Sequence, residues 1–114
     1  MSERTKTLME AVAVLASDPD RQLKHLREIG LPEGIDELAL EFDAIAAAAD
    51  DMLRLQEIDQ DQYDSVKKLD SLVSRMSGNA NAVFWTAESL STALEWKEVR
   101  GVAKECLRHL QVRR

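Results

Sequence analysis

The stretch that decides the fold class runs from Ile35 to Ile58 and reads IDELALEFDAIAAAADDMLRLQEI. Its apolar residues recur at alternating spacings of three and four, which places them on one side of an α-helix. Five alanines between positions 44 and 49 add intrinsic helix propensity. The pattern predicts one helix over about 35–58, roughly 36 Å long at 1.5 Å per residue. Its predicted buried stripe comprises Ile35, Leu38, Phe42, Ile45, Ala49 and Met52.

Shorter helices are predicted on both sides of this segment. Glu3 to Ala16 is amphipathic, and Asp18-Pro19 opens a second helix that ends at Gly30, with Leu23, Leu26 and Ile29 facing inward. Asp59 or Asp61 caps a helix that reaches Met76 and ends in Ser77-Gly78-Asn79. The predicted inward stripe of this helix comprises Val66, Leu69, Val73 and Met76.

Two interpretations fit the C-terminal part. A helix over about 82–90 is followed by Thr92 and Glu95, which have capping-box spacing and predict a further helix from there. One long helix over 82–111 is the alternative. In both cases the buried stripe is Trp96, Val99, Ala103, Cys106 and Leu110. We therefore expect an all-α fold, a single compact helical bundle of five to six helices around the long central helix at about 35–58.

The domain organisation expected from this pattern is one domain overall. The only boundary signal lies near residues 30–34, where glycine and proline concentrate. Residues 1–30 form an N-terminal helical pair, either packed into the bundle or docked less firmly as an arm. Residues 31–114 form the core helical bundle.

Composition excludes several classes of protein. The 114 residues include one cysteine, so no internal disulfide framework is expected. The longest apolar run, residues 44–49, is far shorter than the ~20 residues of a membrane span, and the first residues lack the apolar core of a signal peptide. We therefore expect a cytoplasmic protein that does not enter the membrane.

Catalytic and metal-binding groups are scarce. The sequence lacks a nucleophile elbow and a phosphate-binding glycine loop, so we expect no enzyme activity and no cofactor. Cys106 and His109 lie three residues apart near the end of the last helix, but a zinc site needs three or four ligands. They are weak metal candidates, and the favoured interpretation is a packed thiol and a histidine near a helix C-terminus. A metal- or small-ligand-binding bundle remains the alternative function.

Charge is distributed unevenly along the chain. Residues 33–64 hold eleven acidic residues and one basic residue, a local charge of −10, whereas residues 96–114 hold six basic and two acidic residues, a local +4. Four acidic residues recur every seven positions, namely Asp36, Asp43, Asp50 and Glu57. A basic stripe in the last helix comprises Lys97, Arg100, Lys104 and Arg108. The two stripes either pair within the bundle, remain solvated, or steer a charged partner.

Four apolar residues are candidates for a contact surface. Leu40, Leu55 and Ile58 fall on the acidic side of the predicted long helix, opposite its buried stripe. Trp85 lies off the apolar face of its own segment, and tryptophan is enriched at interfaces. The competing interpretation buries Leu40, Leu55 and Ile58 under the N-terminal helices and Trp85 in the core.

Together these observations favour a small non-enzymatic protein–protein interaction module that presents an acidic helical face. It acts either as a homodimer or as a neutralising or adaptor partner of a basic protein, for example as an immunity-type protein. An accessory DNA-binding module at residues 97–114 is less favoured, because the chain has a net charge of −6 and nucleic acid would be repelled.

Overall fold

The computed structural model describes residues 2–111, and all of its regular elements are helical, which confirms the all-α fold class. The first helix begins at Glu3 and ends at Ala16, as predicted. In chain order the elements are α1 (Glu3–Ala16), α2 (Pro19–Glu28), α3 (Glu37–Ala46), α4 (Ala49–Arg54), α5 (Gln60–Arg75), the 3₁₀ helix η1 (Asn79–Phe84), α6 (Ala87–Thr92) and α7 (Leu94–Gln111).

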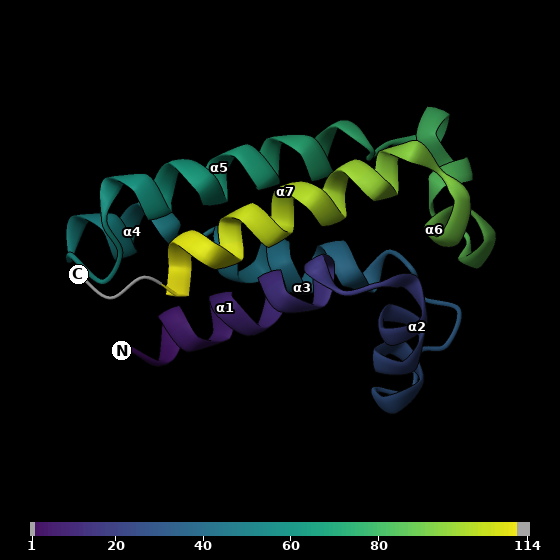
Figure 1. Cartoon of the computed structure of the whole chain (residues 1–114), viewed down its shortest axis with the longest axis horizontal. Coiled ribbons are helices and arrows are strands. Elements are labelled where there is room, and N and C mark those ends of the chain that lie inside the picture. Colours follow the sequence, from purple (N-terminus) through teal and green to yellow (C-terminus); the bar gives the residue numbers. More distant parts are fainter. Residues whose placement is uncertain (1, 112–114) are drawn as a thin grey trace.

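Helices α1, α3, α5 and α7 form a four-helix bundle (Figure 1). α7 packs between α1 and α5, and α3 closes the opposite side by contacting the same two helices. α4 continues from α3 along α5, while α2 and α6 lie together at the far end from the termini. The molecule measures 39 × 28 × 20 Å, a compact shape for this chain length.

The core is built from the predicted apolar stripes. Phe42 and Trp96 are its largest side chains, and both are buried. The stripes of α5 and α7 are buried throughout, as predicted. The stripe of residues 35–52 is also buried except for Ile45, which is half-buried. The hydrophobic effect on these side chains therefore sets which side of each helix faces inward.

The prediction of one continuous helix over 35–58 is wrong. The ladder of hydrogen bonds is interrupted at Ala47 and Ala48, where the amide of Ala48 donates to Ile45, three residues back, at 3.0 Å. Both alanines keep right-handed dihedrals. The apolar stripe therefore stays in register across the break, and Ala49 and Met52 remain fully buried. No glycine or proline marks this position in the sequence, so propensity alone favours a continuous helix.

α4 ends four residues earlier than predicted, in a Schellman motif. The amide of Glu57 donates to the carbonyl of Met52 at 2.8 Å, and that of Gln56 donates to Leu53 at 3.0 Å. Gln56 adopts φ +62°, the left-handed conformation that this motif requires and that glycine usually supplies. Residues 55–58 are therefore not helical, and the helical wheel from which their exposure was predicted does not describe their orientation.

The prediction for residues 82–95 also needs correction. A 3₁₀ helix covers Asn79–Phe84, and Thr86 caps α6 by accepting from the amide of Ser89 at 3.1 Å. Thr92 caps nothing, because its hydroxyl donates to the carbonyl of Glu88 at 2.9 Å inside α6. Ala93 is extended and separates α6 from α7, so the single helix over 82–111 is excluded.

A buried polar residue of α2 contacts the end of α1. Gln22 is fully buried, and its side-chain amide donates to the carbonyls of Val14 and Leu15 at 3.2 and 3.1 Å. These bonds satisfy acceptors at the end of α1 that have no partner within the helix. Asp18 and Pro19 open α2 as predicted, whereas Ile29 is exposed after the end of α2 and does not face inward.

Candidate functional site

Three members of the predicted acidic stripe lie on the outer side of α3 and α4. Asp36 and Asp43 are seven residues apart, so they point the same way from α3, and both are exposed. Asp50 is exposed in the first turn of α4, where its carboxylate accepts from the Tyr63 hydroxyl at 2.5 Å. We call the surface formed by Asp36, Leu40, Asp43 and Asp50 the acidic face.

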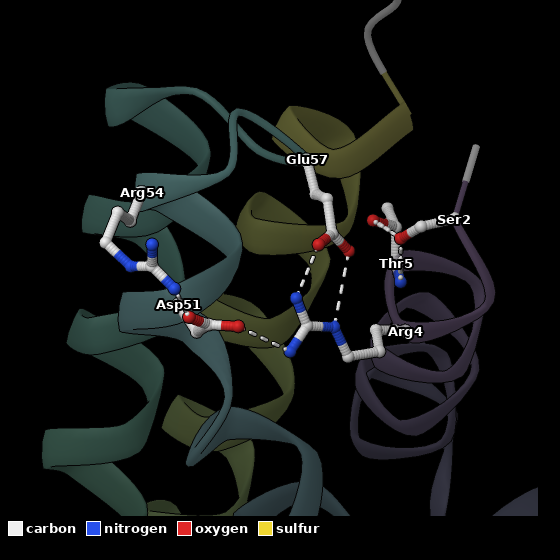
Figure 2. A network of polar contacts seen from close by, with 6 residues as sticks. All are labelled: Ser2, Arg4, Thr5, Asp51, Arg54 and Glu57. Carbon is white, nitrogen blue, oxygen red and sulfur yellow. Dashed lines mark hydrogen bonds and ion pairs between the residues drawn. The ribbon is translucent and has the colours of Figure 1, made fainter.

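A second set of acidic residues, Asp51 and Glu57, is paired with Arg4 (Figure 2). The Arg4 guanidinium lies between Glu57 and Asp51, donating through Nε to Glu57 at 3.3 Å and through a terminal nitrogen to Asp51 at 3.0 Å. The other terminal nitrogen also contacts Glu57, and Arg54 contacts Asp51 from the opposite side. This network connects the start of α1 to α4 and the turn that follows it.

The network changes the acidity of its members. Hydrogen bonds from Arg54 and then Arg4 lower the pKa of Asp51. Hydrogen bonds from Arg4 and then Ser2 lower the pKa of Glu57, and the two carboxylates together raise the pKa of Arg4. Each hydrogen bond or opposite charge favours the ionised form of the group that it contacts. The network is therefore fully charged at neutral pH.

The turn after α4 corrects two expectations about the surface. Ile58, predicted to lie on the acidic side, is 3% exposed and belongs to the core. Glu57 does not continue the acidic stripe, because the left-handed Gln56 directs the chain toward α1 and the carboxylate pairs with Arg4. Leu55 is 53% exposed, as predicted, but it lies at this turn and not beside Leu40.

A hollow of about 490 Å³ opens beside the acidic face, between α3 and the η1 region. It brings together three residues that were predicted separately as partner contacts, Asp36, Leu40 and Trp85. Leu40 is 51% exposed and Trp85 is half-buried. The remaining lining residues are small, namely Ala39, Ser77, Gly78 and Ala82. Ser77 and Gly78 belong to the predicted end of the helix before them, whereas nothing in the sequence indicates that Ala39 and Ala82 line a hollow with them.

Trp85 is held firmly in the wall of the hollow. Its indole N–H donates to the carbonyl of Met76 at 2.8 Å. Its ring meets Trp96 edge-on, with ring centroids 5.4 Å apart and an interplanar angle of 88°. Trp96 is itself buried and donates to the carbonyl of Phe84. The Trp85 side chain therefore packs against the core residue Trp96 and also lines the surface hollow, so both expectations for it hold in part.

No cation in the described part of the chain pairs with the carboxylates of Asp36 and Asp43. Within residues 2–111, neither carboxylate accepts a hydrogen bond or forms an ion pair, and no residue of the basic stripe pairs with the acidic one. Arg100 instead donates to the carbonyl of Leu90 at 2.9 Å and to Gln22 at 3.4 Å, and partial burial lowers its pKa. Arg108 contacts Glu105 on its own helix, while Lys97 and Lys104 are exposed.

The two metal candidates, Cys106 and His109, have different environments. Cys106 is fully buried and accepts from the Ser65 hydroxyl at 3.4 Å, and burial raises the pKa of its thiol. His109 is half-buried, with Nε2 3.9 Å from Glu105. Over the described range, no three histidine, cysteine, aspartate or glutamate side chains gather as a metal site would require.

No helix in residues 2–111 combines the length and apolarity needed to cross a bilayer. Comparison with known proteins adds no further evidence, since no protein-family model, no curated protein and no solved structure matches the chain.

Proposed function

We propose that this chain is a non-enzymatic protein–protein interaction module that binds a basic segment of another protein through the acidic face and the adjoining hollow. The observation that carries this proposal is the exposure of Asp36, Asp43 and Asp50 without a cation partner among residues 2–111, although Arg4 and Arg54 pair with Asp51 and Glu57 nearby. Solvated carboxylates left unpaired on one surface attract positive charge from solution.

A basic partner is favoured over a second copy of the chain. The acidic face lies within a segment of net charge −10, so a symmetric dimer through this face brings two like-charged surfaces together. Like charges at an interface oppose association, whereas complementary charges accelerate it. Neutralisation of a basic protein, as by an immunity-type protein, is one use of such a surface.

Charge and apolar contact have separate roles in this proposal. Each exposed charge pair contributes only about 0.2–1 kcal/mol to affinity. The main role of the exposed carboxylates is therefore to steer the encounter. Leu40 and Trp85 supply the apolar area that excludes water at the centre of a stable contact.

The single thiol, Cys106, is buried and unpaired with another cysteine, which fits an encounter under the reducing conditions of the cytoplasm.

Capture of the partner from the native cell tests the proposal, provided that matched variants are compared. The test variant carries Asp36→Asn, Asp43→Asn and Asp50→Asn. Asp36 makes no side-chain capping bond, and asparagine at position 50 keeps an acceptor for Tyr63. The control carries the same charge change on α1 and α7, with Glu10→Gln, Glu95→Gln and Glu98→Gln, all at exposed positions.

The expected result is a basic protein that the wild-type chain and the control retain at low salt and the test variant loses. Binding should weaken as the salt concentration rises, because mobile ions screen exposed charges. Equal retention by both variants would contradict the proposal, as would a captured protein of acidic character. A concentration-dependent dimer of the purified chain, abolished by Leu40→Asp, would instead assign the face to self-association.

A further inference from the structure

The hollow beside the acidic face combines an aromatic wall with a carboxylate. Trp85 forms part of its lining and is fixed by its bond to Met76 and its edge contact with Trp96. Asp36 contributes a carboxylate that no other described group engages. Leu40 and the small residues leave the space between them open.

This combination selects for a particular chemical group. A cation near the face of an indole ring is attracted by the ring quadrupole, and a carboxylate beside it adds charge complementarity. A guanidinium fits both, because it is planar, stacks on aromatic rings and donates in a fixed fork that matches a carboxylate. An ammonium group is more strongly hydrated and lacks the planar shape.

We infer that the hollow is a subsite for one arginine side chain of the basic partner, with the guanidinium between Trp85 and Asp36 and the aliphatic part against Leu40. This inference rests on the proposed function, and it adds the identity of the side chain that the partner inserts. The hollow, of about 490 Å³, is open toward solvent, so a side chain of the partner can enter it from outside.

The fixed position of Trp85 supports such a role. An aromatic side chain that is already ordered before binding loses little conformational entropy when a ligand stacks on it. The bond from the indole N–H to Met76 also occupies the only donor of the ring, so its remaining interactions are through the π surface and the edges. The site is thus formed in the free chain.

Nuclear magnetic resonance titration of the full ¹⁵N-labelled chain tests the inference. The probes are three blocked tripeptides with glycine on each side of a central arginine, citrulline or lysine. Citrulline keeps the shape of arginine without its charge. The Trp85→Phe variant assigns the indole signal of Trp85, so that it is separated from that of Trp96.

The arginine peptide should shift the Trp85 indole signal and the amides of Ala39 and Gly78 in a saturable manner. We expect roughly tenfold weaker binding for the citrulline peptide and for the Asp36→Asn variant, because each removes the charge pair. Glu98→Gln is the matched control, since Glu98 is an exposed carboxylate on α7 that neither lines the hollow nor belongs to the acidic face, and the affinity of this variant should stay within about twofold.

Other outcomes separate this inference from the proposed function. Equal binding of the arginine and citrulline peptides, or shifts confined to residues outside the hollow, would overturn the subsite and leave the acidic face to be judged by partner capture. Equal binding of the lysine peptide would show that the hollow responds to charge alone, which contradicts a guanidinium subsite. Absence of any shift at the solubility limit of the arginine peptide would also overturn it.

Discussion

The guanidinium of Arg4 contacts the carboxylate of Glu57, which follows it by 53 positions in the chain. The same guanidinium donates to Asp51, so one cation near the N-terminus serves two members of the acidic segment. This pairing divides that segment into two parts. Asp51 and Glu57 hold α1 against α4, while Asp36, Asp43 and Asp50 remain on the surface.

Replacing Arg4 with methionine should lower the midpoint temperature of thermal unfolding by a few degrees. This decrease should be larger at low salt than at high salt. Asp51 and Glu57 have lowered pKa values in the folded chain, compared with ordinary values of 3.8 and 4.5. Their stabilising contribution is therefore complete above those values and is lost as the pH falls through the lower folded values. Unfolding followed by circular dichroism from pH 7 to pH 2 measures this.

The control for this experiment is Arg27→Met, on the exposed side of α2 and without an ion pair among the described residues. The difference between wild type and Arg4→Met should shrink in acid, whereas the control should follow the wild type at every pH. A constant difference down to pH 2 would mean that Arg4 stabilises the fold through its aliphatic stem and not through its charge.

Replacing Gln56 with glycine should raise the free energy of unfolding by about 1 kcal/mol, because glycine adopts the left-handed conformation without steric cost. Gly30 occupies the equivalent position after α2, with φ +81° and a Schellman bond from Leu31 to Leu26. Gly30→Ala should therefore lower stability by about the same amount. Urea unfolding of both variants provides the measurement, and the same sign for both would refute this account of the turns.

Replacing Asp59 with alanine should destabilise the chain by about 1 kcal/mol. Its carboxylate accepts from the amide of Gln62 at 2.8 Å, and the Gln62 side chain accepts from the amide of Asp59, which completes a capping box. Asp59→Asn keeps an acceptor and should recover most of the loss. If alanine and asparagine are equally destabilising in urea, the charge and not the cap is responsible.

Much of this fold is predictable from sequence, and the exceptions have physical causes. The capping residues Asp18 and Asp59 and the buried stripes follow from local chemistry, so the sequence identifies them. The interruption at Ala47 and Ala48 is not predictable, because no residue there opposes a helix. Thr92 and Glu95 have capping-box spacing, yet α6 continues through Thr92 and α7 starts at Leu94 after the extended Ala93.

The candidate site was predictable only in its separate parts. Charge spacing, wheel position and residue type separately predict Asp36, Leu40 and Trp85 as candidate partner contacts, and all three line the hollow. The Glu57 carboxylate pairs with Arg4, which lies 53 positions away in the chain. No local sequence pattern indicates this contact. The prediction for Ile58 is wrong because it assumes a helix that continues to residue 58, whereas α4 ends at Arg54.

The Cys106 thiol should be unreactive in the folded chain. It is fully buried, and burial raises its pKa, so the reactive thiolate is scarce at neutral pH. Modification by a chromogenic disulfide reagent should therefore proceed no faster than opening of the bundle, and urea should accelerate it strongly. Rapid labelling in native buffer would show that α7 separates readily from its neighbours.

The rate of association with the captured partner tests most directly whether the acidic face of α3 and α4 recruits a basic protein. At low salt, Asp36→Asn/Asp43→Asn/Asp50→Asn should associate about tenfold more slowly than wild type, and the difference should vanish at high salt. Glu10→Gln/Glu95→Gln/Glu98→Gln should associate at nearly the wild-type rate. Equal slowing of both variants would mean that net charge alone governs the encounter, and it would contradict the assignment of this face.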